Sequence, residues 1–297
     1  MEKNIATPGV TKELLKKYNI NLKKKLGQNL LIDANILNKM IEGADLSTED
    51  KVIEIGPGIG SLTEKILEVV KKGKVFAIEK DKRFIKILKD VFKNRNNLIL
   101  INNDIRDIDW EIFFNKRNIK PENIKIMGNL PYYISTPIIR MLLEKEFTFS
   151  KLTFMVQKEV AQRMVATPGT KEYGLLSIAV QFYAKSEIIH QVPPTVFLPQ
   201  PEVCSSIIAL SPFFKSPFEV NDINFFFKVV KAIFQLRRKN IKNSLVKGSI
   251  MDLNKETVIK GLKKSGIDPR SRGENLSIEK IVYFSNNLYN LNKERSD

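Results

Sequence analysis

Short apolar runs alternate with amphipathic stretches between residues 51 and 210, and this alternation constrains the fold more than any other feature. The segments LTEKILEVVKK and RFIKILKDVFK carry apolar residues at helical spacing. The runs that flank them are rich in isoleucine and valine and are predicted strands: KVIEIG, KVFAIEK, NLILIN, IKIMGNL and LTFMVQ. Strands that alternate with helices predict an α/β domain whose parallel sheet is covered on both faces. EIIHQVPPTVF and SSIIALSPF are expected to complete the sheet.

The pattern changes after Pro212 and Pro217. Residues 222–290 show helical periodicity in INFFFKVVKAIFQL, KETVIKGLKK and SIEKIVYFSNNLY, and no clear strand. We therefore expect two domains, an α/β domain over 1–213 and a smaller, all-helical C-terminal domain over 214–297. Residues 1–20 are expected to form a flexible extension.

A glycine-rich turn joins the first predicted strand to a helix in VIEIGPGIGSLTEKIL. Glycines let the backbone approach a ligand closely, and a helix N-terminus offers free N–H groups. The dinucleotide fingerprint G-x-G-x-x-G is not matched, because Ser61 stands where its third glycine belongs. Glu54 followed by Gly56, Gly58 and Gly60 instead resembles the first motif of S-adenosylmethionine-dependent methyltransferases. In that motif the loop approaches the amino-acid part of the cofactor.

Two further acids follow the next predicted strands. Glu79 ends the second strand, 23 residues beyond Gly56, where a carboxylate accepts both ribose hydroxyls of a nucleoside cofactor. Asp104 follows the third strand and is placed to accept the amine of the cofactor's adenine. Any one such acid is more often a solvated loop carboxylate. Glu54, Glu79 and Asp104 at the ends of successive strands together favour a ligand site.

The sequence NLPY ends the fourth predicted strand, at the same edge of the sheet. The exocyclic amine of a base is a weak nucleophile because its lone pair is delocalised into the ring. The Asn129 side-chain oxygen and the Leu130 carbonyl would favour a pyramidal, more nucleophilic amine, and Pro131 would fix that backbone. Tyr132 would stack on a flipped-out base. In isolation, NLPY is equally typical of a turn with core tyrosines.

The chain is strongly basic, with 49 lysines and arginines against 33 acids and a formal charge of +16. Counterion release from phosphates rewards many such contacts, so the charge favours a nucleic acid partner. The alternative is a lysine-rich composition with solvated side chains, and any single basic run is more often a solvated face. The candidate RNA contacts are Lys23, Lys24, Lys25, Arg237, Arg238 and Lys239.

Cys204 and His190 are the only cysteine and histidine of the sequence. No disulfide, zinc cluster or histidine-based triad can therefore form within the chain, and we expect no metal. The segment MEKNIATPGVTKELLKK lacks the apolar core of a signal peptide, and no apolar run reaches transmembrane length. We expect a soluble, cytoplasmic protein.

A series of motifs resembles the small-subunit ribosomal RNA adenine dimethyltransferase family across roughly residues 24–288. They occur in family order: KKKLGQNLL, EIGPGIGSLT, GNLPYYISTPI, TPGTKEYGLLS, VFLPQPEVCSS, FQLRRKNIKNSL and GIDPRSRGENLSIEKI. The resemblance implies a Rossmann-like methyltransferase sheet with S-adenosylmethionine as the methyl donor. It implies a monomer that dimethylates the N6 amines of two adjacent adenines near the 3′ end of 16S-type RNA, in the small ribosomal particle.

The same resemblance implies roles for individual residues. A cofactor site would comprise Asn29, Leu31, Gly56, Glu79, Asp104 and Asn129. Asn129 would also hold the target amine, and Phe197 would stack on the target adenine opposite Tyr132. Leu30 stands where the family usually has phenylalanine, and Cys204 stands where an acid is frequent. Neither departure removes a group that the chemistry needs, but the second leaves the contacts with the target loop open.

Several alternatives remain open at this point. A methyltransferase that modifies an adenine of large-subunit RNA and confers macrolide resistance shares fold and chemistry, although YGLLS and GIDPRSRGENLS fit it poorly. A non-catalytic ribosome-assembly or RNA-binding factor would be expected to lack Asn129, Glu79 or the glycines, which are present. A DNA adenine methylase remains possible by chemistry alone. Ser61 and NLPY disfavour a nicotinamide-dependent oxidoreductase.

Overall fold

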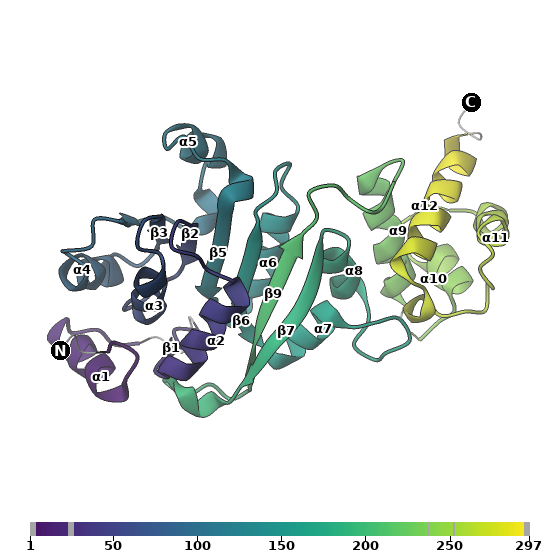
Figure 1. Ribbon diagram of the computed structural model, residues 1–297. Helices are drawn as coiled ribbons and strands as arrows, with labels where there is room; N and C mark the ends of the chain where they lie inside the picture. Colours follow the sequence, from purple (N-terminus) through teal and green to yellow (C-terminus); the bar gives the residue numbers. More distant parts are fainter. Residues whose placement is uncertain (1–3, 23–26, 237, 252, 294–297) are drawn as a thin grey trace. The chain divides into compact units, whose positions relative to one another are not determined.

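The computed structural model describes residues 4–22, 27–236, 238–251 and 253–293 (Figure 1). The chain forms two compact units, Met1–Ala161 with Ala184–Pro212, and Gln162–Tyr183 with Phe213–Asp297. This division differs from the expected one, because residues 162–183 belong to the helical unit instead of the α/β domain.

A seven-stranded sheet forms the centre of the first unit, in the order β4-β3-β2-β5-β6-β9-β7. The strands are β2 (Lys51–Ile55), β3 (Lys74–Ile78), β4 (Leu98–Ile101), β5 (Ile124–Asn129), β6 (Lys151–Gln157), β7 (Ala184–Val192) and β9 (Ser205–Pro212). β2 to β6 run parallel, whereas β9 is antiparallel to both β6 and β7. The sheet confirms the predicted α/β architecture, and its parallel strands are nearly continuous apolar runs because helices cover both faces.

The helices of this unit begin at polar caps. Asp33, Asp81 and Asp109 each accept a backbone N–H of the first turn through the side chain, which satisfies donors that the helix leaves unpaired. The helices are α1 (Pro8–Lys17), α2 (Ala34–Ala44), α3 (Ser61–Val69), α4 (Lys82–Val91), α5 (Trp110–Asn115) and α6 (Tyr132–Leu143), and α7 (Lys158–Val165) leads into the second unit. A small antiparallel pair, β1 (Leu30–Leu31) with β8 (Phe197–Leu198), lies outside the main sheet.

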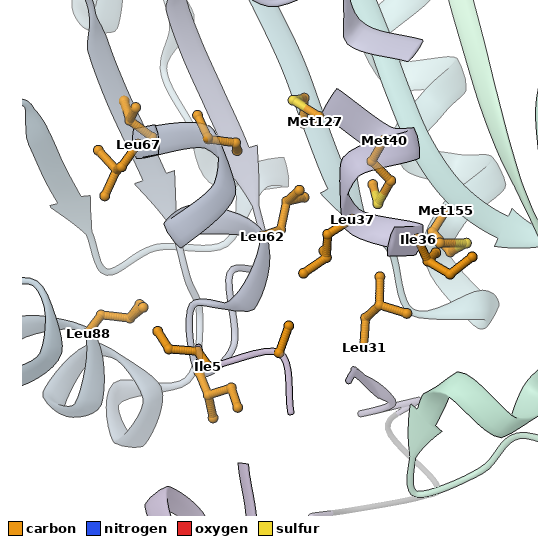
Figure 2. Packing of buried hydrophobic residues seen from close by; sticks show 14 of the residues in the cluster. Ile5, Leu31, Ile36, Leu37, Met40, Leu62, Leu67, Leu88, Met127 and Met155 are labelled. Carbon is orange, nitrogen blue, oxygen red and sulfur yellow. The ribbon is translucent and has the colours of Figure 1, made fainter. Parts of the chain in front are cut away.

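One apolar cluster fixes the helices against the sheet. Figure 2 shows Leu37 and Met40 of α2, Leu62 of α3 and Met127 of β5 among its members. Met40 and Met127 are fully buried. Burial of each such side chain stabilises the fold by about 1.5–3 kcal/mol, so this cluster sets where α2 and α3 lie.

The N-terminal segment is folded, so the expectation of a flexible extension over residues 1–20 is wrong for the part that the structure describes. Ile5 and Ile20 are buried in the same cluster, and Figure 2 shows Ile5 beside Leu88 of α4. The Ile5 N–H donates to a Glu64 carboxylate oxygen at 3.1 Å. The buried Thr11 hydroxyl donates to the Ile5 carbonyl at 3.0 Å. The contacts of Ile5 with Glu64 and Leu88 are with residues distant in sequence, so local composition gave no sign of them.

The second unit contains helices and turns but no strand among its described residues. Its helices are α8 (Leu175–Gln181), α9 (Ile223–Gln235), α10 (Ile241–Lys247), α11 (Lys255–Lys264) and α12 (Ile278–Lys293). Residues 162–183 join them through two aromatic side chains. Phe182 stacks on Phe226 with ring centroids 4.8 Å apart, and the fully buried Tyr173 donates its hydroxyl to the Leu276 carbonyl at 3.0 Å.

The packing of Ile5 predicts that Ile5→Ala destabilises the first unit. Removing a buried isoleucine side chain costs about 2–5 kcal/mol, so the melting temperature should fall by several degrees. Ile112→Ala is the matched control, because Ile112 is 49% exposed on α5. Thermal unfolding followed by circular dichroism compares the two variants. Equal melting temperatures of the two variants would instead support the expectation that residues 1–20 form a flexible extension.

Candidate active site

A cavity of about 440 Å³ opens at the carboxyl edge of the sheet. β2 pairs with β3 on one side and with β5 on the other, so the chain reverses direction across the sheet at β2. Ligands of open α/β sheets bind at such a reversal, and ligand cavities typically measure about 300–1,000 Å³. The sequence-predicted residues that line the cavity are Asn29, Leu31, Glu54, Gly56, Gly58, Glu79, Asp104, Asn129 and Pro131.

The glycines of the first loop have different roles. Gly56 has a φ of +67°, and a Cβ built on it would meet no atom within 4 Å. The backbone there borders open space, which leaves room for a ligand against the main chain. Gly60 does not line the cavity; it begins α3, and a Cβ on it would lie 2.5 Å from a ring carbon of Phe92. Gly60 therefore serves helix packing here instead of contacting a ligand.

Glu79 is held in place by the backbone on both sides of its carboxylate. One oxygen accepts from Gly58 N–H at 3.1 Å, and the other accepts from Asp81 N–H at 2.7 Å. Burial raises the pKa of Glu79, and these backbone donors oppose the increase. Each oxygen keeps a further lone pair, so the carboxylate can accept two hydroxyl groups of a ligand.

Glu54 lies deeper than the sequence suggested. It is 1% exposed, and its carboxyl group accepts from the Thr63 hydroxyl at 2.6 Å. Burial raises the pKa of Glu54 to about 8, the Thr63 hydrogen bond opposes the increase, and the nearby charge of Glu79 adds to it. The group is therefore largely protonated near neutral pH.

Asp104 lies at the rim of the cavity with its carboxylate already paired. Arg106 donates to both oxygens, at 3.0 and 2.6 Å, and Lys80 donates to one at 3.0 Å. The Arg106 guanidinium holds the pKa of Asp104 well below its usual range. A ligand amine that reaches this carboxylate must therefore share it with these two cations.

NLPY joins the end of β5 to the start of α6. The Asn129 amide donates from Nδ2 to the Asn29 carbonyl at 2.8 Å. That bond fixes the amide plane, and Oδ1 has no hydrogen-bond partner among the described residues. Leu130 is 1% exposed, and Pro131 lines the cavity. The structure thus brings a free amide oxygen to the cavity that the glycine loop borders.

The two predicted stacking rings are not open to the cavity. Tyr132 is half-buried, and its hydroxyl lies 2.7 Å from the Ser205 hydroxyl. Phe197, expected to stack on a base, is 3% exposed and belongs to the core cluster. The pairing of β8 with β1 holds Phe197 opposite Leu31. Phe197 therefore cannot stack on an adenine unless the β8 segment moves.

The cavity is also lined by residues that the sequence analysis did not assign to it, among them Ser61 and Tyr133. Ser61, considered there only as a departure from a glycine pattern, is buried, and its hydroxyl has no partner within the described residues. Tyr133, the second tyrosine after Pro131, is 61% exposed and also lines the cavity. A buried hydroxyl without a partner favours a polar ligand, so the cavity fits a cofactor with polar groups.

The candidate RNA contacts are only partly visible. Arg238 and Lys239 are exposed, and they lie in the turn after α9 instead of on the helix. Lys23, Lys24, Lys25 and Arg237 lie outside the described residues. No cluster of three or more potential metal ligands occurs in the described ranges, and none of the helices described there is long and apolar enough to cross a membrane.

Comparisons with known proteins identify the family. The model of the family "Ribosomal RNA adenine dimethylase" matches residues 19–289. The chain is 54% identical over 289 residues to a ribosomal RNA small subunit methyltransferase A of Halothermothrix orenii, covering 97% of this chain and 95% of that protein.

Solved structures extend the likeness. A dimethyladenosine transferase from Plasmodium falciparum is 26% identical, with a TM-score of 0.74 over 90% of this chain and 98% of that one. A 23S rRNA methyltransferase, 23% identical with a TM-score of 0.66 over 88% of this chain and 100% of that one, shares the fold. Since the family model spans nearly the whole sequence and the relative is identical at more than half its aligned positions, the chain belongs to the ribosomal RNA adenine dimethylase family.

Proposed function

We propose that the protein transfers methyl groups from S-adenosylmethionine to the N6 amines of two adjacent adenines near the 3′ end of small-subunit ribosomal RNA, giving N6,N6-dimethyladenines. Membership of the family and the small-subunit name of the relative support this activity. We further propose that the substrate is the small ribosomal particle and that the protein acts as a cytoplasmic monomer.

The cavity residues have roles that suit this cofactor. When bound, S-adenosylmethionine supplies an activated methyl group on its sulfonium. Glu79 would accept the two ribose hydroxyls, because backbone donors hold its carboxylate in place. Asp104 would accept the adenine amine, and the open backbone at Gly56 would face the amino-acid part. The buried Ser61 hydroxyl offers a further donor.

The placement of Asn129 is the observation that carries the proposal. Its Oδ1 would accept an N–H bond of the target amine, while the Asn29 carbonyl keeps the amide from rotating. The amine nitrogen held by Asn129 would then accept the methyl group that S-adenosylmethionine supplies, with the thioether as the leaving group. The extra proton leaves the alkylated nitrogen for solvent, so no titratable base is needed. A second cycle on the monomethyl product uses the same acceptor.

The aromatic rings would act after a local opening. Tyr132 would stack on the flipped adenine, a contact worth about 1–3 kcal/mol per base. Phe197 would reach the other face only when β8 leaves β1, because it is buried in the free protein. Binding of the substrate would supply the free energy for that movement.

Incubation of the protein with methyl-labelled S-adenosylmethionine and unmodified small subunits tests the proposal. Mapping of the methylated bases should find two adjacent dimethyladenines near the 3′ end of the RNA. Naked small-subunit RNA in a parallel reaction tests whether the particle is required. Label in large-subunit RNA or in DNA alone would contradict the proposed substrate.

Glu79→Ala should weaken binding of S-adenosylmethionine about ten- to a hundredfold. A hydrogen bond to a charged partner contributes about 1.5–3 kcal/mol, and alanine cannot accept the ribose hydroxyls. Isothermal titration calorimetry measures the affinity, and a thermal scan checks that the variant is folded. Glu111→Ala, an exposed site on α5, is the control. Unchanged affinity would remove Glu79 from the cofactor site.

The raised pKa of Glu54 predicts that cofactor binding tightens as the pH rises from 6 to 8. In the free protein the carboxyl group is largely protonated at pH 6 and about half protonated at pH 8, since its pKa lies at about 8. The cofactor's ammonium beside it would favour the ionised form, so binding would release a proton. Glu54→Gln cannot ionise and should flatten the pH dependence. Calorimetry in buffers with different ionisation enthalpies counts the protons, and equal release by both proteins would refute this role.

Asn129→Ala should slow methylation by about 10²–10³ at saturating cofactor, because the target amine loses an acceptor aligned for the reaction. Both methyl additions should be slower, since one pocket holds adenine and its monomethyl product. Asn115→Ala, an exposed asparagine that ends α5, is the matched control. Single-turnover assays on small subunits measure the rates. If Asn129→Ala methylates at the wild-type rate, NLPY is a structural turn without a role in the reaction.

A further inference from the structure

Helix α4 presents a row of exposed lysines that no motif identified. Lys82, Lys86 and Lys89 are four and three residues apart, which places them on one face of the helix. Lys93 follows in the turn after the helix, and all four side chains are exposed. We call these residues the α4 lysine stripe. The opposite face of α4 is buried in the core cluster.

The lysine stripe lacks the acidic partners that neighbouring helices provide. Lys39 on α2 pairs with Glu42, and Lys65 on α3 pairs with Glu68, each three residues further along. No carboxylate of the described chain forms an ion pair with a lysine of the stripe. The charge of the stripe is therefore not neutralised by the protein itself.

The stability of α4 does not explain this arrangement. Like charges three or four residues apart on a helix repel each other. At the N-terminus, where the helix dipole is positive, the Asp81 cap pairs with Arg83, and Lys82 adds a cation that has no such partner among the described residues. Lys89 in the last turn is favoured by the dipole, whereas the repulsion among Lys82, Lys86 and Lys89 opposes the helix. Repelling lysines on one face, without ion-paired carboxylates in the part of the chain that the structure describes, point to an anionic partner.

Cations outnumber acids around the stripe, and the stripe lies close to the site. Asp90 is the only acid in the sequence of α4, and its carboxylate accepts from the Tyr18 hydroxyl at 2.5 Å. Lys17 lies over the Tyr18 ring, 5.1 Å from its centroid, and adds a cation and an aromatic face. α4 begins immediately after Asp81, which lines the cavity, and Figure 1 shows it at the edge of the first unit.

We infer that the α4 lysine stripe binds backbone phosphates of the RNA substrate, an inference that rests on the proposed function. The three helical lysines extend over about 10 Å. Phosphates recur about every 3.4 Å along the axis of each strand of duplex DNA, and a comparable spacing in RNA lets the stripe reach several phosphates. A membrane-binding helix would insert its apolar face into lipid, but that face of α4 is buried in the core. RNA is therefore favoured over a lipid surface.

The test compares two variants with the same charge change. The stripe variant replaces Lys82, Lys86, Lys89 and Lys93 by glutamine. The control variant replaces exposed lysines elsewhere in the first unit by glutamine, namely Lys71, Lys116, Lys120 and Lys145. Binding to unmodified small-subunit RNA is measured between 50 and 200 mM salt, and calorimetry checks that both variants bind S-adenosylmethionine like the wild type.

Between 50 and 200 mM salt, the RNA affinity of the wild type should fall about 50-fold more than that of the stripe variant. This estimate takes four phosphate contacts, each of which adds about 0.7 to the slope of log affinity against log salt. The control variant should keep most of the wild-type slope. A stripe variant with the wild-type slope, or two variants with equally reduced slopes, would overturn the inference.

The inference and the proposed function fail separately. If the wild type and the stripe variant show the same salt dependence of RNA affinity while the wild type dimethylates adenine, only the role of the stripe is refuted. The opposite case is a wild type that shows a steeper salt dependence of RNA affinity than the stripe variant and yet methylates no small-subunit adenine. That result would support the stripe as an RNA-binding surface and contradict the proposed reaction.

Discussion

The two hydrogen bonds that Glu79 accepts connect the parts on which the site depends. The Gly58 N–H belongs to the loop after β2, and the Asp81 N–H belongs to the start of α4. A buried carboxylate without such donors would be strongly unfavourable, so the loop and the helix must meet at Glu79 for the fold to form. One side chain thereby shapes the floor of the cavity and fixes where α4 begins. The glycine loop and the α4 lysine stripe consequently keep a constant relation to each other.

The sequence was sufficient for the sheet because each strand is a local apolar run between turn residues. It was insufficient where a segment is fixed by distant contacts. The segment around Ile5 depends on Glu64 of α3, and residues 162–183 depend on Phe226 and Leu276 of the second unit. No local pattern distinguishes such segments from loops, since the stabilising surface lies elsewhere in the chain.

At the site, the residue types were predicted better than their environments. Glu54, Glu79, Asp104 and Asn129 lie together around the cavity because parallel strands end at the same side of a sheet. The protonation of Glu54, the pairing of Asp104 and the burial of Phe197 depend on neighbours that spacing does not reveal. The basic runs were sought as contiguous letters, whereas a helix gathers cations from positions three and four apart. The lysines of α4 form one face only once the helix exists.

The passage of the chain between the two units affects the order in which it folds during synthesis. Residues 162–183 leave the ribosome before β7 and β9, yet they belong to a unit whose remaining helices begin at Ile223. The sheet of the first unit can close as soon as residue 212 is available, whereas Tyr173 and Phe182 must wait for the C-terminal helices that bury them. Until then, this insertion is an uncovered apolar segment of a growing chain, the kind of surface that chaperones recognise. A chain that stops near residue 213 would lack the C-terminal residues that bury Tyr173 and Phe182 and would keep this segment uncovered.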